Sequence, residues 1–461
     1  MTARRSRQMT LVAFMQAANV SVYGGSWRYP STEHSFLDIG YYQKIARTLE
    51  EGTFDLMFFD DRLAMPAIYG DSVAEAVKYG ARPVKLDLLA VLGAVAGVTT
   101  HLGLGATYST TYYEPFHVAR VFGTLDHLTK GRAAWNVVTS VNDAEARNFS
   151  LERHLDHDGR YDRAEEFLEV VTKLWDSWDD DALVLDRETG IFADSTKVHE
   201  LHHRGEYFSV RGPLTVPRSP QGHPPIIQAG SSGRGREFAA RWADVIFTGD
   251  PGLDIAREHY ADQKARVTRQ GRDPDTVRVL PMAYAIVAET ERHAQEKEQI
   301  FLNDLVHPMA SMTLLSELTN FDFNRYSLDD PITDELMDNV TGIRGMVEGV
   351  RRLVGSDRLT LRHLAEHRAT LLQGPRFVGT GAQVADQMTE WFDIGACDGF
   401  VLAATHVPGS YEEFVRLVVP ELRKRKVLRD KYTGTTLRDN LGLPRPDTVH
   451  SSPGLPEPSR A

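Results

Sequence analysis

The sequence predicts an α/β protein built on a (β/α)8 TIM barrel with insertions at the C-terminal face of the barrel. Two observations predict this fold. Eight short apolar runs, of the kind that form buried strands, alternate with helical segments along the 461 residues, and polar residues follow nearly every run. A doubly wound sheet is the competing arrangement, and the count of eight runs together with the polar residues behind them favours the barrel.

The first half of the chain alternates regularly between strand and helix. One helix ends at Gly52, the usual place of a C-cap glycine. The expected elements, in chain order, are the strand Met9–Phe14, the helix Tyr41–Glu51, the strand Phe54–Phe59, the helix Leu86–Val98, the strand Leu102–Thr107, the helix Pro115–Leu128, the strand Ala133–Val138 and a helix from Tyr161 to Trp178.

The second half continues the alternation with two long interruptions. The expected elements are the strand Pro225–Ala229, a helix around Gly235–Trp242, the strands Val245–Thr248, Val277–Val287 and Gly399–Ala403, and the helix Tyr411–Lys424. Residues 179–224 and 288–397 are too long for simple connections, so we expect two insertions. The first holds strand-like pieces such as GEYFSVRG, and the second holds helical segments and no strand.

The chain should form a single domain with a tail. Residues 1–443 should be the domain, and the Pro- and Ser-rich residues 444–461 a flexible tail.

Composition limits the classes of partner. The net charge of −12 argues against a nucleic-acid or anionic-membrane surface. The single cysteine, Cys397, excludes an intrachain disulfide and fits the reducing cytoplasm. No apolar run approaches the roughly 20 residues of a membrane-spanning helix.

The stretch from Trp135 to Tyr161 is the most informative part of the chain. A strand is followed by a polar loop and then a helix, and the polar residues Asn136, Thr139, Ser140, His157 and Tyr161 lie at the strand's carboxyl end or beyond it. Ligands bind at this end in parallel α/β proteins. Amide, hydroxyl, imidazole and phenol groups together suit a polar, phosphorylated cofactor.

A second candidate site follows the fifth strand. Small residues precede a helix there, in the segment QAGSSGRGREFA from Gln228 to Ala239, which includes Ser231 and Ser232. Free backbone N–H groups at a helix N-terminus can bind phosphate, which is one interpretation of this segment. The alternative interpretation is a tight turn that requires glycine. The segment does not have the dinucleotide pattern GxGxxG, so a mononucleotide is the better interpretation.

Two further groups of residues, at strand ends and among the histidines, have both a functional and a structural interpretation. Asp60 and Asp61 end the second strand, either as solvated carboxylates or as acceptors for a bound heterocycle, and Thr107 ends the third strand, where a simple turn is the alternative. The run HELHH from His199 to His203 lacks the spacing of a zinc motif, so we predict no metal site. His307 precedes a proline in the second insertion, where it has either a structural role or a place in a lid near the substrate.

Several segments resemble one family. They are WNVVTSVNDAEARNFS, HDGRYDRAEEFLEVVTKLW, GEYFSVRGPLTVPRSPQG, QAGSSGRGREFA, LVHP and the closing GACDGF, PGSYEEFVRLVVPEL and YTGTTLRDNLGL. In order, from about Met9 to Leu443, they look like the flavin-dependent monooxygenases of the bacterial luciferase superfamily. The similar group is that of nitrilotriacetate monooxygenase component A and the dibenzothiophene-sulfone and long-chain alkane monooxygenases.

The resemblance implies a two-component enzyme. A separate NAD(P)H:flavin reductase would supply reduced FMN, which forms a C4a-(hydro)peroxide with O2 and oxygenates a small organic substrate. That substrate would be an organosulfur or heterocyclic compound cleaved at a C–S or C–N bond. An aminopolycarboxylate substrate and a deazaflavin-dependent oxidoreductase are the alternatives within the superfamily, and a homodimer or homotetramer is expected.

The resemblance also implies site residues. Asp61, Thr107 and Asn136 would contact the isoalloxazine ring, and His307 and Asn136 would be catalytic. Ser140, His157, Tyr161 and Ser231, with Ser232, would hold the phosphate. Phe247 would line the substrate pocket, and His307 would face the substrate from the lid.

One loop departs from the family pattern. Related sequences carry histidines after the first strand, as in NVTHAHGAWRH, whereas this chain reads NVSVYGGSWRY, with Val22, Gly24 and Tyr29 at the matching places. Trp27 is kept, and Tyr23 is a candidate replacement as hydrogen-bond donor to the substrate. Outside the family, a metal-dependent TIM-barrel hydrolase and a non-catalytic binding protein are the remaining alternatives.

Overall fold

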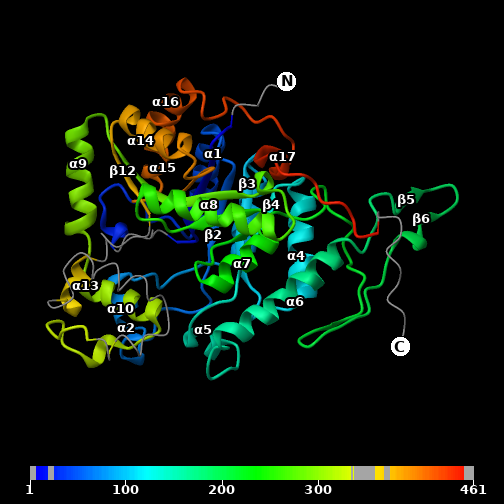
Figure 1. Cartoon of the computed structure of the whole chain (residues 1–461), viewed down its shortest axis with the longest axis horizontal. Coiled ribbons are helices and arrows are strands. Elements are labelled where there is room, and N and C mark those ends of the chain that lie inside the picture. Colours follow the sequence, from blue (N-terminus) through cyan, green and yellow to red (C-terminus); the bar gives the residue numbers. More distant parts are fainter. Residues whose placement is uncertain (1–6, 19–24, 334–335, 337–358, 368–373, 451–461) are drawn as a thin grey trace.

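Eight parallel strands close into a barrel at the centre of the molecule (Figure 1). The computed structural model describes residues 7–18, 25–333, 336, 359–367 and 374–450. The barrel strands are β1 (Thr10–Gln16), β2 (Leu56–Asp60), β3 (Gly103–Ser109), β4 (Ala133–Val138), β9 (Ile226–Gln228), β10 (Val245–Thr248), β11 (Arg278–Val287) and β13 (Gly399–Ala403). Because β10 pairs with β11 as well as with β9, the eight strands close on themselves, and the predicted (β/α)8 fold and its eight strands are confirmed.

The parallel register brings the carboxyl ends of neighbouring strands together. Gln16 at the end of β1 lies opposite Asp60 of β2, and Thr107 of β3 lies opposite Asn136 of β4. Polar residues that follow these strands therefore meet on one face of the barrel.

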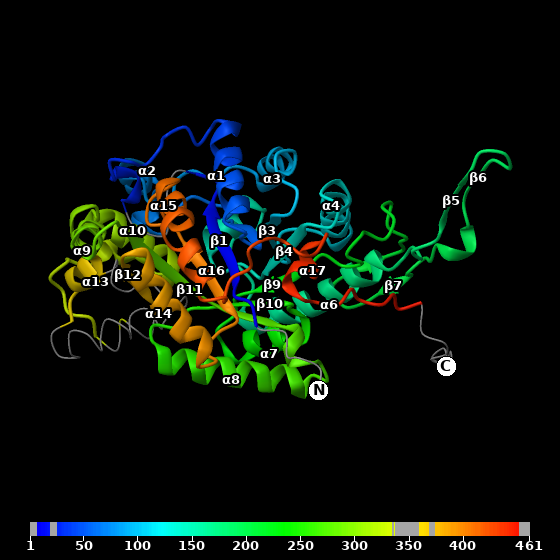
Figure 2. The same ribbon diagram turned by 90° about the horizontal axis from the view of Figure 1, so that it is seen from above.

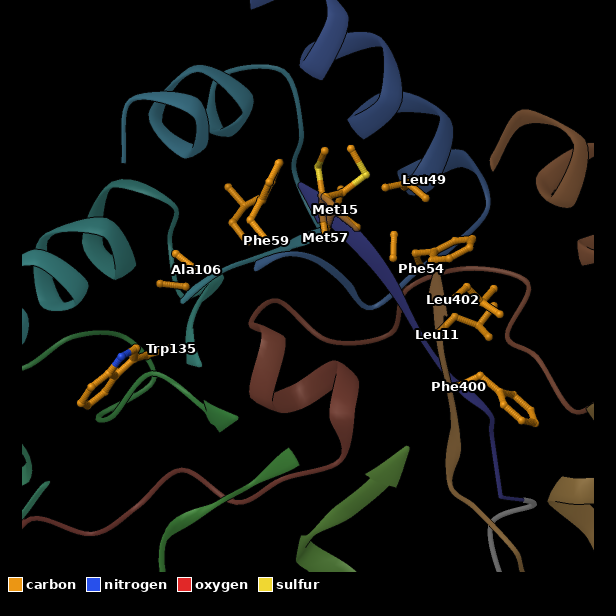
Figure 3. Close-up of a cluster of buried hydrophobic side chains, with 14 of the residues drawn as sticks. Leu11, Met15, Leu49, Phe54, Met57, Phe59, Ala106, Trp135, Phe400 and Leu402 are labelled. Atoms are coloured by element: carbon orange, nitrogen blue, oxygen red, sulfur yellow. The ribbon is translucent and has the colours of Figure 1, made fainter. Parts of the chain in front are cut away.

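Side chains alternate along each strand, so the barrel has one apolar layer inside it and a second one between the strands and the surrounding helices. In β2, Leu56 and Phe58 belong to the cluster inside the barrel, whereas Met57 and Phe59 face the surrounding helices. Figure 3 shows part of the outer layer, in which the side chain of Leu49 lies beside these strands. This layer fixes the strand ends that carry the polar residues.

Helices cover the outside of the barrel (Figure 1). They are α1 (Ile39–Glu51), α3 (Leu88–Ala96), α4 (Pro115–Leu128), α6 (His157–Trp175), α7 (Gly233–Trp242), α8 (Leu253–Arg269), α14 (Gly381–Asp393), α15 (Gly409–Leu417) and α16 (Val419–Lys424). The single closing helix expected over Tyr411–Lys424 is divided at Val418. Pro420 explains the division, because its ring excludes a continuous helical turn and it has no N–H to donate.

Gly52 follows α1 as predicted. Glycine is required there by close packing and not by an unusual backbone conformation. Its φ is −74°, which any residue adopts. A Cβ at this position would lie 2.6 Å from Cγ2 of Val415. Close packing of α1 against α15 therefore requires the glycine.

The first insertion projects from one end of the molecule as the hairpin of β5 (Leu183–Asp186) and β6 (Ile191–Ala193), clearly seen in Figure 2. Within the strand-like piece expected there, Ser209–Val210 forms β8, which pairs with β7 (His203–Arg204) just before that piece. Residues 444–450 run along this insertion, where Arg445 pairs with Asp180. Residues 451–461 of the predicted tail lie outside the described residues, and the division at residue 443 stays a prediction.

The second insertion lies at the opposite end of the molecule, with α10 (Pro308–Thr319) and α13 (Leu361–His367) close to α2 (Ala74–Tyr79) (Figures 1 and 2). α9 (Glu291–Gln299) precedes them, and the short helices α5 (Asp143–Asn148) and α17 (Leu437–Leu441) lie elsewhere on the barrel. The expectation of no strand here is wrong, because β12 (Arg376–Gly379) pairs with the end of β11. Four residues are too few to give a readable alternation. None of the helices described is both long and apolar enough to cross a membrane.

Candidate active site

Polar side chains from three neighbouring strands meet in one cavity at the carboxyl end of the barrel. This strand-end cavity is small, and its empty space is about 200 Å³ when the part open to solvent is included. It is lined by Asp61, Leu63, Thr107, Ser109, Tyr113, Val138, Ser140 and Glu145. Three of the predicted cofactor-binding residues, Asp61, Thr107 and Ser140, therefore share one cavity.

Asn136 joins this group through a chain of buried hydrogen bonds. Its Nδ2 donates to Oγ1 of Thr107 at 2.9 Å, and that hydroxyl donates to the carbonyl oxygen of Phe59 at 2.9 Å. Oδ1 of Asn136 is buried and has no hydrogen-bond partner among the described residues. An unsatisfied buried acceptor costs about 1–3 kcal/mol, so Oδ1 is available to accept a hydrogen bond from a donor that enters the site.

Asp61 is poised to change its charge near neutral pH. Burial raises the pKa of its carboxyl to about 7, with the negative charges of Asp60 and Glu145 adding to the rise and Lys85 opposing it. Oδ1 of Asp61 accepts the backbone N–H of Arg62 at 2.8 Å. The carboxyl can therefore act as an acceptor toward a ring N–H or as a donor, depending on pH.

An arginine of α6 that sequence reasoning missed, Arg160, reaches the loop after β4. Ser140 has a positive φ of 56°, and its Oγ lies 3.1 Å from Oγ of Ser109. Nη1 of Arg160 donates to the carbonyl oxygen of Ser140 at 3.1 Å. Nε of Arg160 is buried without a hydrogen-bond partner in the described part of the chain. Its place directly before Tyr161 in HDGRYDR was the available signal.

Tyr161 connects this loop to the glycine-containing turn after β9. Its hydroxyl hydrogen-bonds with the side chains of Ser232 and Gln228, and burial is the main cause that raises its pKa. Ser232 caps α7 by accepting the N–H of Gly235 at 3.0 Å. A Cβ at Gly235 would lie 2.7 Å from the Tyr161 hydroxyl, so close approach requires glycine here.

The remaining predicted phosphate ligands, Ser231 and His157, do not line the strand-end cavity. Ser231 is exposed at the start of this turn, and His157 begins α6. Nothing is described of the His157 side chain. The turn therefore serves helix capping and packing, and its exposed hydroxyl and amides face outward, where a phosphate can reach them.

The predicted lid residues gather around one tyrosine. His307 caps α10, since its Nδ1 accepts the N–H of Met309 at 3.2 Å. The imidazole stacks on the ring of Tyr79, with centroids 3.7 Å apart, and Nε1 of Trp27 donates to the carbonyl oxygen of Tyr79 at 3.2 Å. Sequence reasoning did not single out Tyr79. Tyr23 lies outside the described residues.

Other predicted or alternative site residues lie away from the cavity. Phe247 packs edge-on against Phe58 in the barrel interior, with centroids 5.1 Å apart, and is not among the residues lining the strand-end cavity. His199, His202 and His203 each pair with a different carboxylate, those of Asp179, Glu200 and Glu166. Tyr29, which replaces a family histidine, packs against the rings of Phe301 and His406.

Comparison with known proteins shows the family of the chain. Residues 15–398 match the luciferase-like monooxygenase family. The chain belongs to this family. It is 48% identical over 442 residues to the dibenzothiophene-sulfone monooxygenase of Rhodococcus erythropolis, covering 95% of this chain and 97% of that protein. It is 43% identical over 454 residues to nitrilotriacetate monooxygenase component A of Aminobacter aminovorans, covering 97% and 99%.

A solved structure agrees over the same extent. The crystal structure of a riboflavin lyase with modified FMN and its substrate riboflavin superimposes with a TM-score of 0.86 at 33% identity, covering 94% of this chain and 96% of that one. The chain is therefore a flavin-dependent monooxygenase, and the family and fold expected from the sequence motifs are confirmed.

Proposed function

We propose that this monooxygenase is the oxygenating component of a two-component system. It takes reduced FMN from a separate NAD(P)H:flavin reductase and uses O2 to oxygenate a small organic substrate. The observation that carries the proposal is that Asp61 and Thr107 line the strand-end cavity and Asn136 bonds to Thr107, with the Asn136 acceptor buried and unsatisfied among the described residues. The relative named component A supports the division into two proteins.

The polar side chains of the site match the hydrogen-bonding groups at both ends of FMN. At the ring end, Asp61 and Asn136 Oδ1 are acceptors for ring N–H groups. At the phosphate end, the buried Arg160 guanidinium supplies positive charge beside Tyr161, and Ser140, His157, Ser231 and Ser232 complete the proposed set. Charge-assisted hydrogen bonds from arginine are well matched to phosphate oxygens.

The chain's own part in the reaction is to bind, orient and shield. Bound reduced flavin, with O2, supplies the oxygenating chemistry. Asn136 and Thr107 fix the ring by a buried hydrogen-bond chain. We propose that His307 on α10 holds a proton at Nε2 for transfer toward the reacting oxygen, since Met309 donates to Nδ1. The substrate pocket would also include Trp27, Tyr23 and Phe247.

The simplest test supplies each component separately. Mixed with NADH or NADPH, FMN and O2, the pure protein should oxidise no nicotinamide, and adding an unrelated flavin reductase should start oxygen-dependent turnover of a substrate. Oxygen electrode and absorbance measurements follow both. Steady nicotinamide oxidation by the pure protein would contradict a two-component system, and substrate reduction without oxygen uptake would point to the deazaflavin alternative.

Phosphate recognition should appear as a difference between two flavins. Replacing Tyr161 by Phe, or Ser231 by Ala, should weaken FMN binding by about tenfold, the effect of losing one charge-assisted hydrogen bond, and leave riboflavin binding nearly unchanged. Fluorescence titration measures both affinities. Tyr207→Phe changes an exposed tyrosine and serves as the matched control. Equal losses for both flavins would exclude a phosphate role.

The raised pKa of Asp61 makes flavin binding depend on pH. Above a pKa of about 7 the carboxylate is ionised and accepts a ring N–H, whereas below it the carboxyl is protonated and that acceptor is weakened. Riboflavin affinity should therefore fall by about fivefold between pH 7 and pH 6, as the ionised fraction of the carboxyl falls, and Asp61→Asn should remove this dependence. Riboflavin is used because the FMN phosphate titrates in the same range. An unchanged pH profile in the variant would contradict the assignment.

Assembly and location are also proposals. The hairpin of β5 and β6 exposes the apolar side chains of Leu185 and Phe192, to 60% and 66%. Apolar groups gathered on a projecting hairpin favour a protein contact, and we propose a second copy of this chain, in a homodimer or homotetramer. We also propose that the enzyme works in the cytoplasm with its reductase, without nucleic-acid or membrane partners.

A further inference from the structure

The inner rim of the barrel carries a row of polar side chains at the carboxyl ends of β1 to β4. Side chains two residues apart on a strand point to the same face, so the apolar residues inside the barrel show which polar ones face inward. In β1, Gln16 shares its face with Val12, which belongs to the cluster inside the barrel. The same alternation turns three further polar residues inward, namely Asp60, Thr107 and Asn136. Gln16 has no role in the flavin site proposed above.

Neighbouring members of this row lie side by side. In the parallel register Gln16 is opposite Asp60, and Thr107 is opposite Asn136. Nε2 of Gln16 donates a long hydrogen bond, of 3.4 Å, to Oδ2 of Asp60. Asp60 is followed directly by Asp61, a proposed ring acceptor. Gln16 therefore lies about one strand spacing, roughly 4.8 Å, from the segment that is proposed to hold the flavin ring.

Gln16 presents an unused hydrogen-bond acceptor. The residue is only 3% exposed. Its Oε1 is buried and has no hydrogen-bond partner among the described residues, which is also the condition of Oδ1 of Asn136 in the same row. A buried acceptor without a partner is unfavourable, and a ligand that brings an N–H group to the rim removes that cost. The row thus offers a second amide oxygen to a bound ring.

The amide of Gln16 is held in one orientation by its neighbours. Nζ of Lys85 donates to Oδ1 of Asp60 at 2.9 Å, and the Lys85 side chain is largely buried, so this ion pair fixes the carboxylate. The other oxygen of Asp60 accepts from the Gln16 amide nitrogen. Turning the amide over would place Oε1 against the carboxylate, with one acceptor facing another. Gln16 therefore presents an oxygen, and not an N–H group, to a ligand.

The rim has more acceptors than an oxidised flavin ring has donors. The acceptors are the ionised carboxylate of Asp61, Oδ1 of Asn136 and Oε1 of Gln16. An oxidised isoalloxazine ring carries a single N–H, at N3, and its N5 is itself an acceptor. The reduced ring carries an N–H at N5 as well. A fixed acceptor beside N5 is repelled by the oxidised ring and forms a hydrogen bond with the reduced one.

We propose that Gln16 is a further ring-binding residue, whose Oε1 accepts the N5–H group that the flavin carries only when it is reduced. Gln16 thereby makes the barrel rim prefer reduced to oxidised FMN. Asp60 and Lys85 are positioning residues, which act by holding the amide of Gln16 in one orientation. This inference rests on the proposed function, because it adds a residue to the same ring site. Such a preference lets the protein take up reduced flavin and release the oxidised form.

The reduction potential of FMN bound to the full-length protein tests the inference without turnover. Anaerobic titration gives the Kd of oxidised and of reduced FMN, and spectroelectrochemistry gives the potential. The parent protein should bind reduced FMN more tightly and so raise its potential above that of free FMN. Gln16→Met keeps the length of the side chain and removes the acceptor. It should lower the ratio of oxidised to reduced Kd by about tenfold, which lowers the potential of bound FMN by about 30 mV.

Two further variants separate recognition from packing. Gln263→Met removes a buried glutamine of α8, whose amide donates to the carbonyl oxygen of Arg236, and should keep the parental ratio. Asp60→Asn replaces the carboxylate by an amide that can donate to Oε1 of Gln16. The Gln16 amide can then turn over, so this variant should also lose the preference for reduced FMN. If Gln16→Met does not fold, Asp60→Asn decides.

The outcomes distinguish this inference from the proposed function. Equal affinity of the parent protein for the two oxidation states, or an undiminished ratio in Gln16→Met, overturns the inference and leaves the flavin site in place. Equal weakening of both oxidation states in Gln16→Met also overturns it, because Gln16 would then support the shape of the site and not recognise N5–H. A parent protein that binds neither form overturns the proposed flavin site, and the role of Gln16 with it.

Discussion

Replacing His307 by alanine should reduce coupled product formation by about 10²-fold and leave FMN affinity nearly unchanged, because a positioned acid or base contributes on this scale. Met309 donates to Nδ1 of His307, so in the neutral imidazole the proton is at Nε2 and available for donation. Stacking on Tyr79 holds the ring in one orientation. Product formation per oxygen consumed, with an accepted substrate, is the measurement.

Two controls separate proton transfer from helix capping. His307→Asn retains a good N-cap and should recover little activity if the imidazole transfers a proton. Thr290→Ala removes the equivalent cap of α9, where the N–H of His293 donates to the threonine hydroxyl, and should leave product formation unchanged. Full activity in His307→Asn would reduce His307 to a capping residue, and parental activity in His307→Ala would exclude both roles.

The barrel could be predicted from the sequence because its strands are short, buried and separated by clear helices. The run Ala133–Val138 is apolar and ends abruptly at Thr139, and β4 has the same bounds. β12 could not be found, since it is a four-residue strand added to the outside of β11 and its pattern is too short to read. The division of the closing helix could have been predicted from Pro420, which the expected single helix Tyr411–Lys424 did not take into account.

The site was predictable where its residues end strands. Asp61, Thr107 and Ser140 follow or end neighbouring strands, and parallel register places them around one cavity. Tyr79 becomes part of the site only through the packing of α2 against α10, and no local pattern reports that packing. Contacts between distant segments are therefore the part that sequence patterns leave open.

In a single turnover without substrate, with the protein in excess over reduced FMN, replacing Asn136 by alanine should raise the rate of hydrogen peroxide release by about 10- to 100-fold, the effect of losing one buried hydrogen bond to a charged or reactive group. The variant loses both the buried acceptor Oδ1 and the donor that orients Thr107. Because the measurement needs no substrate, it is independent of the substrate's identity.

The matched control removes a buried asparagine elsewhere. Asn440 lies in α17, which packs beneath the opposite, N-terminal end of the barrel, where Leu437 donates its N–H to the carbonyl oxygen of Gly131. Asn440→Ala should lower stability without changing peroxide release. Thr107→Val should give an intermediate increase, because Asn136 keeps its acceptor and loses only the group that positions its amide. If Asn136→Ala binds FMN weakly and releases peroxide no faster than the parent once saturated, Asn136 contributes to flavin affinity alone, since a residue that protects the reacting flavin must change the lifetime of its oxygen adduct as well as its binding.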